Sequence, residues 1–263
     1  MSLRIDRVEG DVMKVNSFVV HGPTGAVVVD GMLTVSDAAK VRRAVQETGL
    51  PLAGVVLTHP HPDHYAGLAR ILGDDEVPIV ATEAVDEVIR RDDAVKDQIV
   101  SPMMGPQWPT VRPFPTVTVA DDAEVELGGL VLRARSLGPG ESFADTLWLL
   151  DDDTVFAGDI AYHGMHAYLA DGRWPQWLAV LDQLEGELPA TVALHVGHGP
   201  PGGLDLLAAQ RRYLQAFEAA IERHPDGDHA PVVAAMRAEL PTEDLLFLLE
   251  LSVEPALAAV RGR

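Results

Sequence analysis

The chain has 263 residues with 40 acidic and 20 basic side chains, which gives a formal charge of −20 at pH 7. A surface of this charge repels polyanions and releases few counterions, so it excludes nucleic acid as an expected partner. Because the sequence contains no cysteine, disulfides, thiolate metal ligands and a cysteine nucleophile are excluded as well.

The hydropathy pattern gives no membrane or export signal. Residues 1–20 lack a positively charged start followed by an apolar core, and no apolar run approaches the ~18 residues that a membrane span needs. We therefore expect a cytoplasmic protein without a membrane partner. Its length fits one large α/β domain with an appendage.

The first half of the chain predicts strands that alternate with helices. The turn residues Gly22-Pro23-Thr24-Gly25 predict a β-hairpin between two apolar strands, and Ser36 predicts a helix N-cap. The apolar periods of this half predict strands at 12–20, 26–29, 51–57 and 77–81, and helices at 36–49 and 83–91.

Residues 101–115 contain five prolines together with Met103, Met104, Trp108 and Phe114, so they cannot form regular structure throughout. Two interpretations remain open. The segment is either a packed crossing on the surface or an apolar lid over a pocket.

The second half predicts a further group of strands followed by helices. Gly128-Gly129 predicts a hairpin turn within this group. The predicted strands lie at 117–119, 125–127, 130–134, 146–150, 154–157 and 191–196, and the helices at 175–188, 204–223, 231–240 and 242–260. The last helices are amphipathic and are candidates for a homodimer face.

The most informative segment is Thr58-His59-Pro60-His61-Pro62-Asp63-His64, which follows a predicted buried strand. Imidazole nitrogen and carboxylate oxygen are the donors that suit Zn²⁺ and related metals, and three of the ten histidines fall within these seven residues. The segment therefore predicts a metal site, with Asp63 and His64 in the first turn of a helix.

Polar residues also follow two other predicted strands. Asp159 follows the strand at 154–157, and His198 follows the strand at 191–196. Side chains that follow buried strands are held by a rigid element and remain accessible, which is where α/β folds tend to gather their sites. We expect the histidine segment, Asp159 and His198 to meet.

The order of four motifs resembles that of the metallo-β-lactamase-fold hydrolases, and looks glyoxalase II- or lactonase-like. The motifs are Thr58-His59-x-His61-x-Asp63-His64, Pro139-Gly140-Glu141, Ala157-Gly158-Asp159 and Val196-Gly197-His198-Gly199. The resemblance covers about residues 11–203. It implies a four-layer αββα sandwich at 1–203 with a helical extension packed on it at 204–263.

The same resemblance implies two divalent metal ions, with zinc as the first expectation and manganese or iron as alternatives. Carried over by position, His59 and His61 bind the first ion, Asp63, His64 and His198 bind the second, and Asp159 bridges them. Each histidine needs an acceptor for its other ring nitrogen, and Asp30 and Thr58 are the candidates.

Glu141 departs from the family pattern, in which a third histidine follows Pro-Gly. Its carboxylate leaves a dinuclear site less positive, so the site acidifies water less. Three outcomes remain open: a neutral dinuclear site, a first site that prefers Mn²⁺ or Fe²⁺, or a Glu141 that points away and leaves a single well-bound metal.

The expected reaction is attack of a metal-activated hydroxide on an ester-like carbonyl of a small organic molecule, a thioester or a lactone. Asp63 or Asp159 orients the nucleophile. Two alternatives remain: an iron-dependent oxidoreductase of the same fold, and a catalytically weakened binding protein. Arg211-Arg212 gives only weak support for a patch that binds glutathione.

Four further residues near these motifs have two open interpretations. His163 and His166 either line the substrate pocket or lie in solvent, and Tyr162 or Tyr168 is a candidate donor to an oxyanion. Strand alternation turns His195 away from the site, so we expect a structural role for it.

Overall fold

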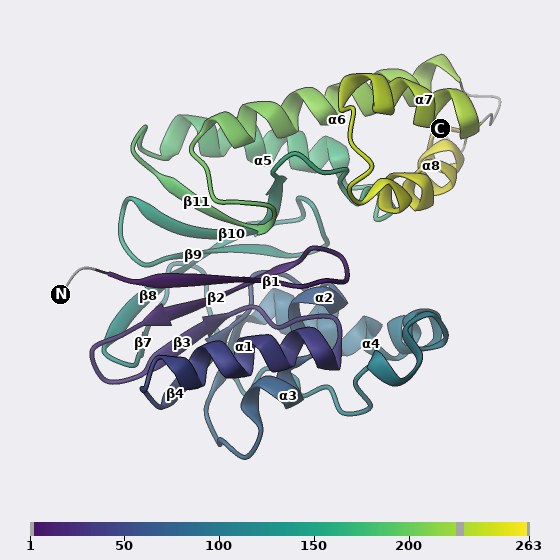
Figure 1. Ribbon diagram of the computed structural model, residues 1–263. Helices are drawn as coiled ribbons and strands as arrows, with labels where there is room; N and C mark the ends of the chain where they lie inside the picture. The colour runs from purple at the N-terminus through teal and green to yellow at the C-terminus, as the bar shows by residue number, and fades with distance from the viewer. Residues whose placement is uncertain (1–2, 225–228, 262–263) are drawn as a thin grey trace.

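The computed structural model describes residues 3–224 and 229–261, in which two β-sheets face each other (Figure 1). The first sheet has the order β1-β2-β3-β4-β5-β6, with β1 Ile5–Glu9, β2 Asn16–His21, β3 Ala26–Val29, β4 Leu52–Val56, β5 Ile79–Thr82 and β6 Val117–Val119. The second has the order β11-β10-β9-β8-β7, with β7 Glu124–Leu127, β8 Leu130–Gly138, β9 Asp145–Leu149, β10 Thr154–Tyr162 and β11 Ala193–His198.

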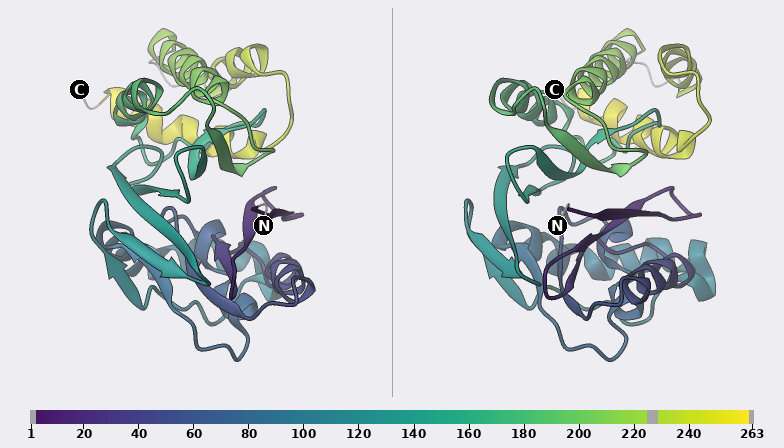
Figure 2. Two further views of the ribbon diagram at one scale, coloured as in Figure 1. Left: turned by 90° about the vertical axis from the view of Figure 1, so that its left-hand side faces the viewer. Right: turned by 60° about the vertical axis from the view of Figure 1, so that its left-hand side comes forward.

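Helices cover the outer face of each sheet (Figures 1 and 2). Those beside the first sheet are α1 Val35–Glu47, α2 Pro62–Tyr65, α3 Leu68–Leu72 and α4 Glu83–Met104, followed by the short 3₁₀ helix η1 Gly105–Gln107. Those beside the second sheet are α5 Trp174–Glu187, α6 Asp205–Arg223, α7 His229–Glu239 and α8 Leu246–Arg261.

Three apolar layers hold these elements together. One lies between the two sheets and includes Phe18, Trp148 and Phe156. The other two lie between each sheet and its helices. Burial of apolar surface on both faces of a sheet is what favours a layered α/β arrangement. The order helix, sheet, sheet, helix is the predicted four-layer sandwich with a helical C-terminal region, and the fold class is confirmed.

The N-terminal predictions need two corrections. Strand β1 was not predicted. The first predicted strand began at residue 12, but residues 11–14 form a turn with positive φ at Met13 and Lys14. The N-cap of α1 is Thr34 and not Ser36, because the Thr34 Oγ1 accepts from the Asp37 N–H at 3.2 Å.

The predicted helix at 83–91 is longer in the structure. α4 continues to Met104 with Pro102 inside it. Trp108, which follows η1, is buried, whereas Met103 on α4 is 62% exposed. The segment 101–115 therefore begins as helix and ends as a packed crossing.

Asp159 lies inside β10 rather than after a strand, because β10 continues to Tyr162. The pairing of β10 with β11 shifts register on both sides of Gly158, which has φ +53°. Such irregularities redirect a side chain within a strand. Here the shift lets an acidic residue in the middle of a strand face the site.

The C-terminal helices pack on the second sheet and on α5. Phe217 of α6, Val232 of α7 and Leu249 of α8 belong to the same apolar layer as strands β10 and β11. The division into a domain at 1–203 and an extension at 204–263 stays a prediction. Within residues 3–224 and 229–261, no helix is both long and apolar enough to cross a membrane.

Candidate metal centre

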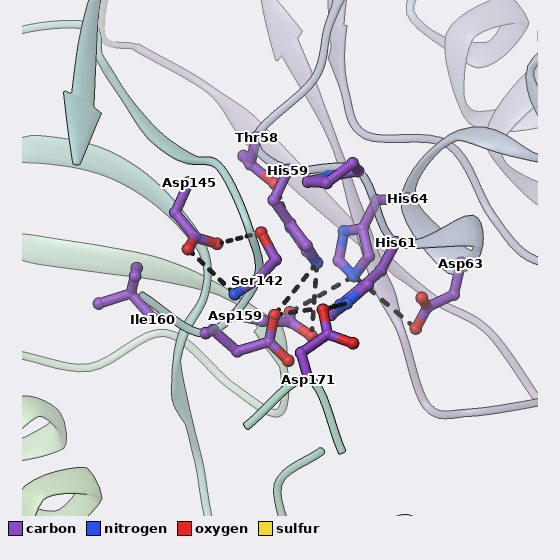
Figure 3. Close-up of polar contacts among 12 residues, drawn as sticks. Thr58, His59, His61, Asp63, His64, Ser142, Asp145, Asp159, Ile160 and Asp171 are labelled. Carbon is purple, nitrogen blue, oxygen red and sulfur yellow. Dashed lines mark hydrogen bonds and ion pairs between the residues drawn. The ribbon is translucent and has the colours of Figure 1, made fainter. Parts of the chain in front are cut away.

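Side chains from four distant segments of the chain lie close together, and Figure 3 shows part of this group. All seven predicted metal ligands are there and all are at most 8% exposed. We call them the His/Asp/Glu cluster: His59, His61, Asp63, His64, Glu141, Asp159 and His198. Metal binding by these residues stays a prediction, but their convergence is a property of the fold.

One half of the cluster is formed by His59, His61, Glu141 and Asp159, whose ligand atoms all lie within 4.8 Å of one another. His61 Nδ1 lies 3.0 Å from Glu141 Oε2. His59 Nε2 lies 3.9 Å from the same oxygen and 3.8 Å from Asp159 Oδ2. Glu141 therefore points into the centre, against the interpretation in which it turns away.

The other half is formed by Asp63, His64 and His198, which also lie within 4.8 Å of one another. His198 Nε2 lies 3.4 Å from Asp63 Oδ2 and 3.2 Å from Asp159 Oδ2. His64 Nε2 lies 3.3 Å from Asp159 Oδ1. Asp159 thus contacts both halves, the position expected of a bridging carboxylate.

Asp30 orients two of the histidines. Its Oδ2 accepts from His64 Nδ1 at 2.9 Å and from the Thr58 hydroxyl at 2.7 Å. Because the Thr58 proton is used in this bond, Thr58 Oγ1 accepts from His59 Nδ1 at 2.9 Å. In both rings Nδ1 then carries a proton, and Nε2 faces the centre, where it is available to a metal ion. The structure places Asp30 and Thr58 where the sequence analysis expected them.

The remaining two histidines use partners that sequence reasoning missed. His198 Nδ1 donates to the Met13 carbonyl at 2.9 Å, and His61 Nε2 lies 3.2 Å from Asp171 Oδ2. Met13 and Asp30 both have positive φ, 64° and 59°. Backbone strain of this kind is common at functional sites. The local sequence does not predict the contact to His198, because Met13 contributes only its backbone carbonyl.

Asp145 fixes the turn that carries Glu141. Its carboxylate accepts from Gly140 N at 2.9 Å, from Ser142 N at 3.0 Å and from Ser142 Oγ at 3.0 Å. Burial raises the pKa of Asp145 to about 6, against the lowering from the bonds to Ser142. This residue was also missed, although Ser142 three positions earlier is a typical partner for such a turn.

The donor set fits divalent metal ions. Among the described residues, several buried atoms of the cluster have no hydrogen-bond partner: His59 Nε2, His64 Nε2, Glu141 Oε2, Asp159 Oδ1 and His198 Nε2. Buried polar atoms without partners are costly and rare. Five of them converge from four segments, a donor set that a divalent ion would satisfy, and nitrogen and oxygen donors suit first-row metals.

The electrostatics of the cluster point the same way. Burial lowers the pKa of His198, but Asp159 and Asp63 outweigh it and raise that pKa to about 9. Burial raises the pKa of Asp159, but His198 and His64 hold it well below its usual range. The carboxylates thus draw positive charge into the centre, and metal ions would take the place of these protons.

Two glycines let the strands approach. A Cβ on Gly197 would lie 1.9 Å from Asp159 Oδ1 and 2.7 Å from His64 Cε1. A Cβ on Gly158 would lie 2.6 Å from Thr58 Oγ1. The Gly-Asp and Gly-His-Gly motifs are therefore needed for space as well as for ligands.

The hydrogen-bond partners of other residues near the motifs show which of them belong to the site. Tyr162 is close to the reacting centre, since its hydroxyl donates to Asp159 Oδ2 at 2.7 Å and lies 3.2 Å from Glu141 Oε1. His163 instead bonds the Pro200 carbonyl, and His166 is buried against Tyr213 and Thr242. The two histidines therefore do not line the site, whereas Tyr162 and Tyr168 do.

His195 has the structural role expected of it. Its ring packs between the sheets against Phe18 and Phe156, with centroids 5.2 and 5.0 Å away. Arg211 forms ion pairs with Asp182 and Glu185 of α5, so it gives no support for a glutathione site.

A family model described as the metallo-beta-lactamase superfamily matches residues 10–198. Similar sequences include proteins named hydroxyacylglutathione hydrolase. The one from Albidiferax ferrireducens is 28% identical over 245 residues, which cover 91% of this chain and 81% of that protein. The one from Cupriavidus metallidurans is 26% identical over 245 residues, which cover 90% and 80%.

Solved structures of the same fold cover almost the whole chain. A beta-lactamase domain protein from Burkholderia ambifaria matches with a TM-score of 0.72 at 16% identity, over 99% of this chain and 86% of that one. A metallo-beta-lactamase family protein from Thermus thermophilus matches with a TM-score of 0.70 at 20% identity, over 99% and 93%. At these identities the likeness shows the fold alone.

Proposed function

The chain belongs to the metallo-β-lactamase superfamily and is a metallo-β-lactamase-like hydrolase, and from this premise we propose that it cleaves an ester-like bond, with a thioester of a small organic acid as the favoured substrate. The observation that carries the proposal is the convergence of five unpartnered buried donor atoms in the His/Asp/Glu cluster.

In this proposal His59, His61 and Glu141 would hold one divalent ion, Asp63, His64 and His198 would hold a second, and Asp159 lies beside both groups. Metal ions in such a centre acidify water and polarise a carbonyl oxygen. The four imidazoles make zinc the first expectation, and the carboxylate that Glu141 adds to the first group makes manganese or iron the alternatives.

Residues of the chain would orient the nucleophilic water and exclude bulk solvent. Asp63 and Asp159 accept hydrogen bonds and can orient a nucleophilic water, because each has an oxygen directed at the centre. The Tyr162 hydroxyl, held between Asp159 and Glu141, is a proton donor beside the reacting atoms. Burial of the histidines excludes bulk water from all but the open side of the centre.

The thioester is favoured over the lactone by the relatives, since an acyl group on glutathione is joined through sulfur. The leaving thiolate needs less protonation than an alkoxide, which suits a centre whose positive charge is reduced by Glu141. We propose a small-molecule substrate, and the net charge of −20 argues against nucleic acid.

The test is metal loading followed by a substrate panel. Protein stripped with a chelator is reloaded separately with Zn²⁺, Mn²⁺ and Fe²⁺, its metal content is measured by elemental analysis, and hydrolysis of thioesters, lactones and phosphodiesters is followed. We expect metal-dependent thioester hydrolysis. Full metal loading without hydrolysis of any ester-like bond would overturn the proposal.

A second candidate is favoured by one observation. His59 and His61 are grouped with the carboxylates of Glu141 and Asp159, and two histidines with a carboxylate are typical of non-heme iron oxygenases. An iron-dependent oxidoreductase would retain iron during purification in preference to zinc, and its loaded form would consume dioxygen with a thiol substrate. Zinc retention without dioxygen uptake would exclude it.

A further inference from the structure

The His/Asp/Glu cluster opens on one side into a cavity of about 220 Å³. His61, Asp63 and Asp159 form its inner end, and helices α4 and α8 form its walls. One water needs only ~10–15 Å³, so the cavity has room for part of a substrate. We call it the apolar pocket, because all the side chains on its two helical walls except Lys96 are hydrocarbon or thioether.

The walls are apolar even where they meet solvent. Ile99 and Met103 of α4 are 60% and 62% exposed, and Phe247 and Leu251 of α8 are 42% and 53% exposed. These four are among the most exposed large apolar side chains of the described residues. Exposed apolar groups that gather around one opening indicate a binding surface, and methionine adapts to ligands of varied shape.

The apolar pocket has little positive charge on its walls. Among the described residues that line it, Lys96 is the one cationic side chain, and its Nζ donates to the Pro60 carbonyl at 2.7 Å. Burial lowers the pKa of Lys96, and the carboxylates of Asp171 and Asp92 oppose this lowering. This wall therefore offers one cation, which is directed at a backbone carbonyl, to receive the several charges of a peptide-like thiol.

We propose, resting on the proposed hydrolase function, that the apolar pocket binds the hydrocarbon acyl chain of a thioester whose carbonyl lies at the cluster. The acyl chain would run between α4 and α8 from the inner end to the exposed rim, by which we mean Ile99, Met103, Phe247 and Leu251. The hydrocarbon gains free energy by leaving water, and the rim needs no charge to hold it.

A chain-length series tests this. Acetyl, butyryl, hexanoyl, octanoyl and decanoyl thioesters of N-acetylcysteamine share one small neutral thiol. With the metal-loaded enzyme, kcat/KM is expected to rise about two- to fourfold per methylene until the pocket is filled. A kcat/KM that is flat or falls beyond acetyl would overturn the proposal.

Substitutions at the rim locate the effect. Ile99→Asp and Phe247→Asp change exposed side chains, so they should leave folding intact, and each should lower the octanoyl-to-acetyl ratio of kcat/KM by about tenfold. The matched control is Val111→Asp, which introduces the same charge at a side chain that is 66% exposed and lies outside the pocket. An unchanged ratio in both rim variants would refute the placement of the chain.

Two further measurements separate this inference from the function on which it rests. S-alkyl thioethers of N-acetylcysteamine cannot be hydrolysed, and calorimetry should show affinity that rises with alkyl length. If it does while no thioester is cleaved, the hydrolase proposal fails and the pocket assignment stands. If rim variants instead convert a dimer to a monomer and affinity does not depend on alkyl length, the rim is a face between two copies and the pocket assignment fails.

Discussion

The His/Asp/Glu cluster and the walls of the apolar pocket lie side by side and differ in almost every physical respect. In the cluster, side chains are at most 8% exposed, and each histidine is fixed by a named partner. On the walls, side chains such as Met103 are more than half exposed, and the carbon atoms that face the cavity need no hydrogen-bond partner.

This difference separates two requirements of an enzyme. A group that holds an ion or moves a proton must be fixed to within a fraction of an ångström, which requires buried, hydrogen-bonded side chains. A group that selects among hydrocarbon chains needs only apolar area. We therefore expect substitutions in the cluster to affect metal content and rate, and substitutions at the rim to affect only which substrate is used.

The largest effect is expected for Asp159→Ala, which removes the carboxylate between both halves of the cluster. Metal content and thioester hydrolysis should fall together, by more than the ~100-fold that loss of an outer partner can cost. Elemental analysis and kcat/KM are the measurements. Asp74→Ala, at an exposed aspartate, is the control and should change neither. Retained metal with lost activity would show that Asp159 is not a ligand.

A smaller effect is expected for the outer carboxylates, and it should scale with the number of histidines each one orients. Asp30→Asn disturbs His64 directly and His59 through Thr58, so metal affinity should fall about 10- to 100-fold. Asp171→Asn disturbs only His61 and should cost about tenfold or less. Chelator competition measures both. Equal losses would contradict this ranking.

Glu141→His should change which metal is kept rather than whether one is kept. A neutral nitrogen in place of a carboxylate favours Zn²⁺ over Mn²⁺, and we expect retention of zinc in the first group to rise about tenfold. Glu141→Gln, which removes the charge but keeps the shape, is the control and should weaken retention of every metal. If Glu141→His leaves metal content and preference unchanged, Glu141 is not a ligand.

The smallest effect is expected for His195, a histidine outside the cluster, and it concerns the pH dependence of stability. Burial lowers the pKa of His195 to about 4, below the ~6.5 of an unfolded chain. Its contribution to stability is therefore full above pH ~6.5 and is lost as the pH falls toward ~4. In His195→Phe this loss should shrink by about 1 to 2 kcal/mol, reduced by the ring's partial exposure.

Urea unfolding of the two proteins at pH 7 and pH 4.5, at matched metal content, measures this difference. The phenylalanine ring suits the neighbouring Phe18 and Phe156, so the variant should be no less stable at pH 7. An unchanged difference in stability between the two pH values would show that His195 does not titrate in this range.

The local sequence was enough to predict most elements and the segments of the site, and the family resemblance of its motifs predicted the fold class. Periodicity predicted most strands and helices, since burial of one face leaves a trace in the order of apolar residues. The motifs around His59, Asp159 and His198 marked the chemistry, because metal donors and close-packed glycines are restricted residue types. The same reasoning placed His195 in the core by strand alternation.

Local patterns could not predict which partners meet. Asp171 and Asp145 resemble the many other acidic residues of the chain, and Met13 takes part through its carbonyl alone. Nothing in the order of residues shows that α4 and α8, more than 140 positions apart, face one cavity.

Side-chain chemistry depends on the local sequence, which therefore marked the candidate metal donors, and the order of the motifs implied the layered fold through its resemblance to a known family. Distances between remote segments follow from the packing of whole sheets and helices. Only the tertiary structure decided how the donors are oriented, where Asp159 lies within β10, and which apolar side chains remain exposed around the site.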